Sequence, residues 1–418
     1  MSRVRGAIQA TGDRGERVAA PGRRVRWIPP VCRIAAASGT TREGFSAPPP
    51  LRVVACLPRR ARSAAEECGR GPVQPVMSGR RQRGVLVVVG FLAMAAHGVA
   101  TGHAAAETAR SVRHKMGSRF EVTAIHPDPA AAWRAVEAAY AEIDRLEALV
   151  SEWIDTSEVS ALNRSAGVRP VRMSPEVLAL VQRALSVSRL TGGAFDITFL
   201  SLGQLWDFAA VAPTKPDPAA MRAALAGVGA EKVVVDAAAG TVFLSDPRTR
   251  VGFGAIGKGW AANAGVRVLR EHGASGGVVN AGGDLLAFGR REDGRPWRVG
   301  IANPLDRDRV FGYLEVTDLA VVTSGDYERF VVIDGERFSH IVDPRTGYPV
   351  REVRSATVVC PDAELADALA TAVSVLGVEE GLAVLDALHG VEGLLVDEHG
   401  KIHLSSNLSG QIIDEEEP

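Results

Sequence analysis

The sequence predicts an α+β protein with largely antiparallel sheets and packed helices. Short apolar runs that end in glycine, proline or aspartate turns follow one another from Lys232 onward, which is typical of strands joined by hairpins. A few longer segments repeat apolar residues at helical spacing, but they do not alternate strictly with the strands. This order favours α+β over a βαβ series. The composition, 46% hydrophobic and 23% charged, is that of a globular protein.

The first 76 residues differ from the rest of the chain. They contain fourteen arginines, no lysine and many prolines, without sustained periodicity. A disordered basic tail, a targeting segment and translation from upstream of the true start are the three interpretations. We favour the last one, because Met77 begins an orthodox export signal. The predicted organisation is therefore an extension at 1–76, a signal peptide at 77–106 and a single folded domain at 107–418.

The export signal has three parts. Arg80, Arg81 and Arg83 form a basic start, and the segment 85–96 is a short apolar core. Small residues at 104–106 then offer a cleavage site. We expect an exported protein, either periplasmic or anchored at the outer face of the inner membrane, with an uncleaved anchor as the alternative.

Charge and cysteine content narrow the function classes. Residues 107–418 hold 31 basic and 44 acidic residues, a net charge of −13, which argues against a nucleic-acid partner. Within this range Cys360 is the single cysteine, so the sequence predicts neither an internal disulfide nor a cysteine metal cluster. Its apolar neighbours predict a buried strand position.

The first predicted elements have clear local signals. The first strand alternates polar and apolar residues, and the helices repeat apolar residues at helical spacing. Ser174 and Pro175 form a helix start with an N-cap serine. In order, these elements are a strand at 118–126 and helices at 130–153, 175–190 and 218–227. The later strands are 232–235, 242–245, 277–280, 285–289, 297–301, 312–316, 319–323, 330–333, 356–360, 393–396 and 402–404, and the later helices are 258–271, 364–376 and 378–388.

A glycine-rich turn at 251–259 precedes the helix at 258–271. Exposed backbone N–H groups at a helix start suit a phosphate. The turn matches the dinucleotide pattern G-x-G-x-x-G and most of a P-loop, but Gly259 stands where a P-loop needs Ser or Thr. A Rossmann unit would use Asp284 as its ribose acid, in an unusual mid-chain context. The alternative is a turn that only packs helix on strand.

The helix at 364–376 is apolar nearly all round, which predicts burial. Its polar line consists of Glu364, Asp367, Thr371 and Ser374. Asp367 and Thr371 are four residues apart and face the same point. A carboxylate, a hydroxyl and nearby carbonyls suit Mg²⁺. The alternative is a solvent-facing edge that carries these residues by chance.

Three further turns carry polar groups. The turn at 280–284 is glycine-rich and would be a plain hairpin turn in most proteins. The turn at 323–329 offers a hydroxyl and a glycine to a phosphate. The third places His340 and Asp343 at the mouth of a Pro/Gly-rich turn, where a histidine near a carboxylate can carry a proton. The loop at 193–198 looks uncapped.

In this order the pieces resemble the ApbE family of FAD:protein FMN transferases, over about residues 112–408. The motifs that carry the resemblance are M-G-S (116–118), S-E-V-S-A-L-N (157–163), G-A-F-D-I-T (193–198), G-A-I-G-K-G (254–259), N-A-G-G-D (280–284), T-S-G-D-Y-E-R-F (323–330), H-I-V-D-P-R-T-G-Y-P (340–349) and A-D-A-L-A-T (366–371).

The resemblance implies one catalytic unit with FAD in a central cleft. Its reaction would move FMN from FAD to a Ser or Thr hydroxyl of a target protein, release AMP and require Mg²⁺. The acceptor would be a membrane redox protein with an extracytoplasmic Ser or Thr. The alternatives are an FAD pyrophosphatase that releases FMN and AMP, and a non-catalytic periplasmic FAD-binding protein.

The resemblance also implies roles for residues. Mg²⁺ would be held by Asp367 and Thr371, with carbonyls at Ala255 and Ala370. Lys258, His340 and Asp343 would act in catalysis. The implied FAD-binding residues are Met116, Trp153, Ala194, Phe195, Asp196, Gly252, Lys258, Asn280, Gly282, Gly283, Ser324, Gly325, His340 and Ile341. Trp153 stands where relatives often carry Tyr, and Gly252 stands where many carry Asp.

Overall fold

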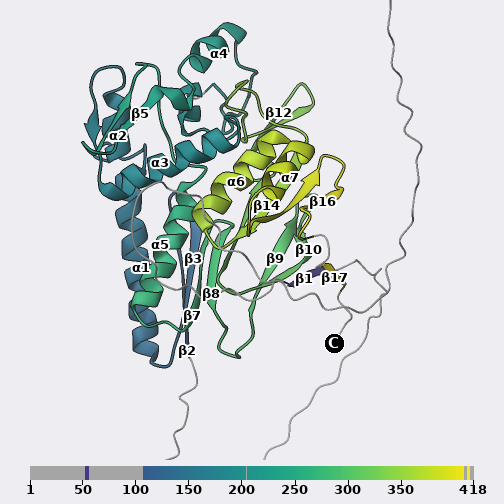
Figure 1. Ribbon diagram of the computed structural model, residues 1–418. Coiled ribbons are helices and arrows are strands. Elements are labelled where there is room, and N and C mark those ends of the chain that lie inside the picture. The colour runs from purple at the N-terminus through teal and green to yellow at the C-terminus, as the bar shows by residue number, and fades with distance from the viewer. Residues whose placement is uncertain (1–51, 56–106, 204, 409–411, 415–418) are drawn as a thin grey trace, which may run out of the picture.

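A large antiparallel sheet forms the centre of the molecule (Figure 1). The computed structural model describes residues 52–55, 107–203, 205–408 and 412–414. The sheet has eight strands in the order β16-β15-β14-β11-β8-β7-β3-β2, and all neighbouring pairs are antiparallel. Its strands are β2 (Glu107–Lys115), β3 (Ser118–His126), β7 (Gly276–Ala281), β8 (Asp284–Gly289), β11 (Leu319–Gly325), β14 (Val353–Cys360), β15 (Glu392–Asp397) and β16 (Ile402–Leu404). The predicted α+β class with largely antiparallel sheets is confirmed.

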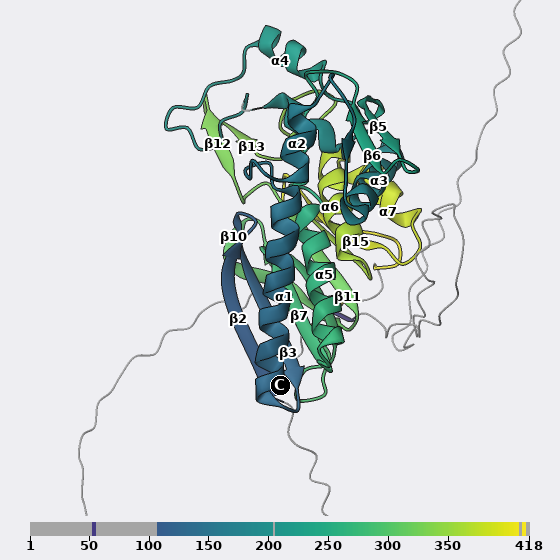
Figure 2. The same ribbon diagram turned by 90° about the vertical axis from the view of Figure 1, so that its left-hand side faces the viewer.

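Helices α1 (Pro129–Val150), α5 (Gly257–Glu271) and α6 (Ala363–Leu376) cover one face of this sheet. Figure 2 shows α1 and α5 lying side by side along the strands. Tyr140 and Leu369 from the helices and Phe120 from the sheet are fully buried in the shared core. Burial of this apolar surface is the main source of stability for the layered arrangement. Helix α7 (Val378–Asp386) follows α6 and leads to β15.

A second, four-stranded sheet packs on the opposite face, in the order β17-β1-β10-β9. Its strands are β1 (Arg52–Ala55), β9 (Trp297–Asn303), β10 (Asp306–Val316) and β17 (Ile412–Asp414). Leu314 and Val316 of β10 pack against Val321 and Val359 of the large sheet. Strand β1 lies within the predicted N-terminal extension and pairs antiparallel with β10. The predicted signal peptide at 77–106 lies outside the described residues.

A third group of elements lies beyond one end of the large sheet, at the top of Figure 1. It contains a three-stranded sheet, a separate hairpin and several short helices. Its elements are α2 (Glu158–Arg164), β4 (Val171–Arg172), α3 (Pro175–Leu190), the 3₁₀ helix η1 (Ile197–Leu202), α4 (Pro218–Leu225), the 3₁₀ helix η2 (Ala230–Lys232), β5 (Val233–Asp236), β6 (Thr241–Leu244), β12 (Phe330–Ile333) and β13 (Glu336–Ser339). Stacked rings of Trp206 and Phe338 join the hairpin β12–β13 to this group.

Local signals explain where helices begin. Ser174 caps α3 by accepting a hydrogen bond from the N–H of Val177, as the sequence predicts. The prediction that the 193–198 loop is uncapped is wrong. Asp196 accepts hydrogen bonds from the N–H of Thr198 at 2.8 Å and from its hydroxyl at 2.7 Å, and so begins η1. Cys360 is buried in β14, as expected. Among the helices that the structure describes, none has the length and apolar character needed to cross a membrane.

Candidate active site

Several of the predicted site residues lie at one end of the large sheet. Because β8 and β11 are antiparallel, the first residue of β8, Asp284, pairs with Val322 in the middle of β11, and the last residues of β11 extend beyond it at this end. The turn between β2 and β3 reaches the same end, since β3 pairs antiparallel with β7. Helices α5 and α6 contact each other, and the N-terminus of α5 and the middle of α6 lie at this end as well. Segments far apart in sequence therefore meet at a single place.

Met116 lies in the β2–β3 turn with a φ of 47°, a left-handed conformation that is uncommon for a residue other than glycine. Its N–H donates a 2.9 Å hydrogen bond to Glu147 Oε1, which holds the turn against α1. A Cβ added to Gly257 would lie 3.6 Å from the Met116 methyl group. Met116 therefore contacts the start of α5, beside the glycine-rich turn. Strained backbone of this kind is often found at functional sites.

Gly259 lies where α5 and α6 touch. A Cβ at this position would lie 2.1 Å from the carbonyl oxygen of Ala363, so no side chain fits. The steric limit explains why this position cannot hold the Ser or Thr of a P-loop. The N–H of Gly259 donates a 2.9 Å hydrogen bond to Asp367 Oδ2 instead.

The polar line of α6 faces the protein interior. Asp367 and Glu364 are 2% and 4% exposed, and Ser374 is also buried. The alternative of a solvent-facing edge is therefore wrong. Burial raises the pKa of Asp367, while Lys258 and the N–H groups of Gly259 and Lys258 oppose this rise. A buried carboxylate of this kind needs compensating partners.

Lys258, in the first turn of α5, forms an ion pair with Asp284. Asp284 is only 2% exposed. Burial and the nearby charge of Asp367 raise the pKa of Asp284 to about 7, against the opposing effect of Lys258. Burial alone would lower the pKa of Lys258, but the charges of Asp284 and Asp367 outweigh it and raise that pKa. The three groups therefore form a single electrostatic unit.

The donor set of this cluster fits a hard divalent cation. Two buried carboxylates, Asp284 and Asp367, share one lysine, so their ionised forms leave one negative charge in excess. Thr371 lies one turn beyond Asp367, and its Oγ1 is 3.4 Å from Ser324 Oγ. Within the described residues, no three or more His, Cys, Asp or Glu side chains form a metal-binding group. A cation site here would therefore depend on hydroxyl and carbonyl oxygens beside Asp367, as Mg²⁺ accepts.

His340 follows β13 directly, and the charge of Lys258 acts on its ring. Its N–H donates a 3.0 Å hydrogen bond to the carbonyl of Arg329, and its ring Nδ1 is 3.2 Å from the same oxygen. The residue is exposed at the surface, but surrounding protein partly desolvates the ring and lowers the pKa of His340. The charges of Arg329 and Lys258 act in the same direction.

The buried carboxylate of Asp326 fixes the turn before β12. Arg337 of the hairpin donates to its main-chain carbonyl at 3.0 Å, and Arg354 of β14 donates to its Oδ2 at 3.1 Å. These contacts tie the β12–β13 hairpin to the large sheet. They therefore restrain His340, at the end of the hairpin, relative to Lys258.

Comparison with known proteins places this arrangement in a family. The sequence model of the ApbE family matches residues 116–395, which is more than half of the chain. The chain belongs to the ApbE family. An FAD:protein FMN transferase of Klebsiella pneumoniae (strain 342) is 34% identical over 276 residues, covering 65% of this chain and 79% of the relative. A second one, from Vibrio cholerae serotype O1, is 35% identical over 257 residues, covering 59% and 75%.

Solved structures agree with this assignment. The flavin transferase ApbE from Vibrio cholerae superposes with a TM-score of 0.66 at 30% identity, covering 73% of this chain and 99% of that structure. The fold described above is therefore the ApbE fold, as the sequence motifs predicted.

The ApbE motif around Asp343 forms a self-contained turn. Arg345 donates to Asp343 Oδ1 from Nε at 2.9 Å and to Oδ2 from Nη2 at 3.0 Å. The N–H of Arg345 adds a 2.8 Å hydrogen bond to Oδ1. Both carboxylate oxygens are thus engaged within the turn, and the catalytic role implied for Asp343 stays a prediction.

The ApbE motif at 193–198 contributes mainly buried side chains. Ala194 and Ile341 pack together with Val375 of α6, and Phe195 lies in the main core. Asp196 lines a cavity of about 430 Å³ with residues of three other segments. The lining residues are Ser188, Arg189, Gly192, Gly193, Asp196, Leu225, Val228, Gly229, Ala230, Glu231, Pro344 and Arg345. The remaining aromatic candidate, Trp153, is 79% exposed in the turn between α1 and α2.

The ApbE motif N-A-G-G-D spans the hairpin turn between β7 and β8. A hairpin turn is the structural role that the sequence predicts for this segment in most proteins. Asn280 Oδ1 accepts the N–H of Gly283 at 2.9 Å. Gly282 has a φ of 69° and leaves only 2.8 Å between an added Cβ and Ser118 Cβ. The turn delivers Asp284 to Lys258, so Asp284 is the site residue that the predicted set omits. The sequence signal that could have identified Asp284 is its position directly after two glycines of a turn.

Two ApbE-motif glycines occupy packed positions. Gly252 donates its N–H to Ile197 at 2.9 Å, and an added Cβ would lie 3.3 Å from Leu200 Cδ2. Gly252 therefore docks the turn against η1. Gly325, at the end of β11, leaves no room for a Cβ beside the ring of Tyr327.

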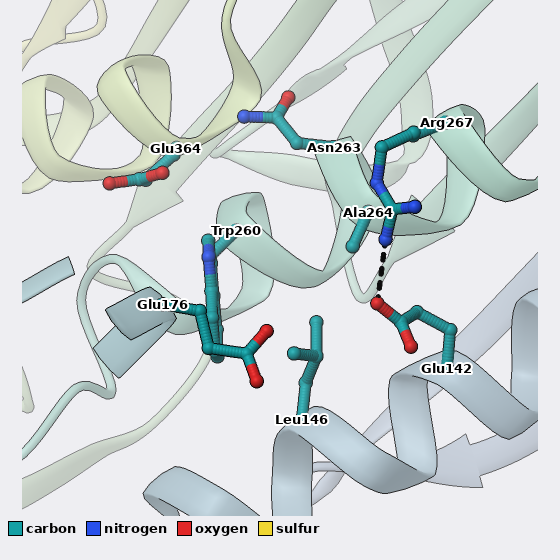
Figure 3. Close-up of a pocket in the computed structure, with 8 residues that line it drawn as sticks. All are labelled: Glu142, Leu146, Glu176, Trp260, Asn263, Ala264, Arg267 and Glu364. Atoms are coloured by element: carbon teal, nitrogen blue, oxygen red, sulfur yellow. Dashed lines mark hydrogen bonds and ion pairs between the residues drawn. The ribbon is translucent and has the colours of Figure 1, made fainter. Parts of the chain in front are cut away.

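A second cavity, of about 270 Å³, lies among α1, α3, α5 and α6 (Figure 3). Its walls are Glu142, Leu146, Glu176, Trp260, Asn263, Ala264, Arg267 and Glu364. None of the predicted site residues lines it. Figure 3 shows Arg267 directed toward Glu142, with which it pairs at 2.7 Å.

Proposed function

We propose that this ApbE-family protein transfers FMN from FAD to a Ser or Thr hydroxyl of a target protein and releases AMP, with Mg²⁺ as the metal. The observation that carries the proposal is the group formed by Lys258 and the buried carboxylates of Asp284 and Asp367. Asp367 lies on the helix that also carries Thr371, whose hydroxyl contacts that of Ser324. The relatives named FAD:protein FMN transferase support the same reaction.

The chemistry of a pyrophosphate fits these residues. Cleavage depends on positioning and on neutralising negative charge rather than on covalent help. Asp367 and Thr371, with the carbonyls of Ala255 and Ala370, would hold Mg²⁺, which supplies charge neutralisation at the phosphoryl oxygens when bound. Lys258 would place a second positive charge at the pyrophosphate. Met116 and Trp153 would line the site of the flavin.

His340 is the residue best suited to accept a proton. Its lowered pKa keeps the ring neutral at pH 7. The nearby carbonyl of Arg329 favours a proton on Nδ1, which leaves Nε2 free as an acceptor. A Ser or Thr hydroxyl that loses its proton to Nε2 becomes the nucleophile that attacks the FMN phosphorus of FAD. The new O–P bond forms as the pyrophosphate P–O bond to the AMP half breaks, and AMP leaves as an anion.

The test combines the purified chain, FAD, Mg²⁺ and a candidate acceptor, followed by a denaturing gel inspected for a fluorescent acceptor band. The band should vanish with EDTA and with an acceptor whose Ser or Thr is replaced by Ala. AMP release without acceptor would instead indicate a pyrophosphatase. Intact bound FAD in excess Mg²⁺ would indicate a carrier. Absence of covalent flavin on every redox-membrane acceptor tried would refute the transferase.

We also propose export of this protein, with a membrane redox protein as its acceptor on the outer side. The basic and apolar segments after Met77 support the export. Intact mass spectrometry of the protein from its native cell should give a mature chain that begins at Glu107. A mass that corresponds to a start at Met1 would refute both the start site and the cleavage.

A further inference from the structure

We propose that Asp284 is a positioning residue that holds Lys258 away from Asp367. Lys258 then faces the pyrophosphate of FAD, and Asp367 stays available to the cation. The inference rests on the proposed function, because it assigns Lys258 to the pyrophosphate. It adds a role for a carboxylate that is absent from the catalytic, FAD-binding and Mg²⁺-binding residues implied by the family resemblance.

The geometry offers Lys258 two acidic partners. The lysine lies in the first turn of α5 with its side chain partly exposed, and the buried carboxylates of Asp284 and Asp367 both act on it and raise its pKa. Its ion pair is with Asp284. The Oδ2 atom of Asp367 instead accepts the N–H of Gly259. Asp284 therefore takes the ammonium group of Lys258, whereas Asp367 takes main-chain N–H groups at the start of α5.

Asp284 is the more rigid member of its ion pair. It lies on β8, which pairs on one side with β7 at Ala281 and on the other with β11 at Val322. The Gly282–Gly283 turn, with positive φ at both positions, sets the direction in which β8 begins. A lysine has four rotatable side-chain bonds, so a fixed partner removes conformational freedom before the ligand binds. Asp284 thereby preorganises Lys258.

Loss of Asp284 should redirect the lysine. Asp367 would be its nearest remaining buried acid, and a Lys258–Asp367 pair would occupy the carboxylate that the cation needs. The pyrophosphate would lose its positioned ammonium group at the same time. Charge alone predicts the opposite sign, because removing a negative group near an anionic ligand should strengthen binding. Weaker FAD binding on loss of Asp284 therefore indicates a positioning role, whereas tighter binding indicates a simple effect of charge.

The experiment is an FAD titration of the full chain in EDTA, followed by flavin fluorescence, so that binding is measured without turnover. We expect Asp284→Asn to raise the Kd for FAD about tenfold, and Lys258→Met to do the same. The double variant should bind no more weakly than Lys258→Met, because Asp284 acts through the lysine. The matched control is Glu328→Gln, which removes another charge that acts on Lys258 and should leave binding unchanged or tighter.

Each outcome decides the inference. Unchanged or tighter binding by Asp284→Asn would overturn it, as would an equal loss of affinity from Asp284→Asn in the Lys258→Met background. If Asp284→Asn does not fold, Asp284→Glu replaces it, with the charge kept and the carboxylate displaced; weaker binding is then expected, and unchanged binding overturns the inference. A wild-type chain that binds no FAD, with or without Mg²⁺, would overturn the proposed function as well.

Discussion

The N–H of Gly259 and the carboxylate of Asp367 join two helices at a distance of 2.9 Å. Through this contact, the positive end of the α5 dipole stabilises a buried acid of α6. The N–H of Lys258 acts on the same carboxylate. Some of the main-chain N–H groups at the start of α5 are therefore already used by Asp367. Recognition of a pyrophosphate would then depend on Lys258 and a cation more than on exposed N–H groups.

Replacement of Gly259 by Ala should destabilise the fold. The added Cβ would lie 2.1 Å from a backbone oxygen of α6, so the two helices must separate. We expect a loss of roughly 1–3 kcal/mol in the free energy of unfolding, measured by urea denaturation. The control is Gly254→Ala, in the same turn, where the nearest atom is 4.0 Å away and little change is expected. Equal stabilities of the two variants would contradict the close helix contact.

Asp367→Asn should strongly reduce Mg²⁺-dependent flavin transfer while the fold persists. The amide keeps the shape of the side chain but removes the charge that a divalent cation requires. We expect a decrease on the order of 100-fold or more in kcat/KM, measured by acceptor flavinylation over a range of Mg²⁺ concentrations. Glu364→Gln, a change of another buried acid of α6, should leave the Mg²⁺ dependence as it is. Normal activity of Asp367→Asn would refute the metal assignment.

Much of this arrangement could be predicted from the sequence, because the signals were local. Apolar residues on nearly all sides of the helix identified α6 and predicted that the helix as a whole is buried. The motif order also identified the ApbE fold. Sequence alone could not decide whether the polar line of α6 faced solvent or another helix. The answer depends on Gly259, more than a hundred residues earlier, whose missing side chain lets α5 approach.

Other features depended on contacts that no local pattern reveals. The hairpin strands β2 and β13 and helix α2 were not predicted, since their side chains are largely polar or their runs short. The sequence predicts a role for Asp284 only as the ribose acid of a Rossmann unit. Its partner, Lys258, comes from a different element, and their meeting requires the register of β8 in the sheet.

The pH dependence of flavin transfer should report His340. Desolvation lowers its pKa below the ordinary 6.5, so the ring stays a competent base to a lower pH than an exposed histidine. We expect kcat/KM to fall with decreasing pH, with a midpoint below 6.5. His340→Asn should lose this acid limb together with most of the rate. His403→Asn, which changes a histidine paired with Asp397, should keep it. A limb that survives in His340→Asn would assign the proton to another group.

Glu364 should make the protein less stable as the pH rises. Burial raises the pKa of Glu364 to about 8, although Arg183 opposes the shift from 2.8 Å. That contact has no hydrogen-bond geometry, since Oε1 has no hydrogen-bond partner among the described residues. In the unfolded chain the group ionises near its ordinary pKa of 4.5. Between these values the folded state binds more protons, so the free energy of unfolding falls as pH increases.

The Glu364→Gln variant tests this linkage, because the amide does not titrate. The wild type should lose on the order of a few kcal/mol relative to the variant between pH 5 and pH 8.5, measured by urea denaturation at both values. The two proteins should be closest in stability at pH 5, where the carboxyl group is protonated in the folded state. Arg183 keeps its contact with Asp362 in the variant, which limits the structural effect of the change. Parallel stability curves for the two proteins would show that Glu364 ionises in the folded state near its ordinary pKa, and that the pairing with Arg183 outweighs burial.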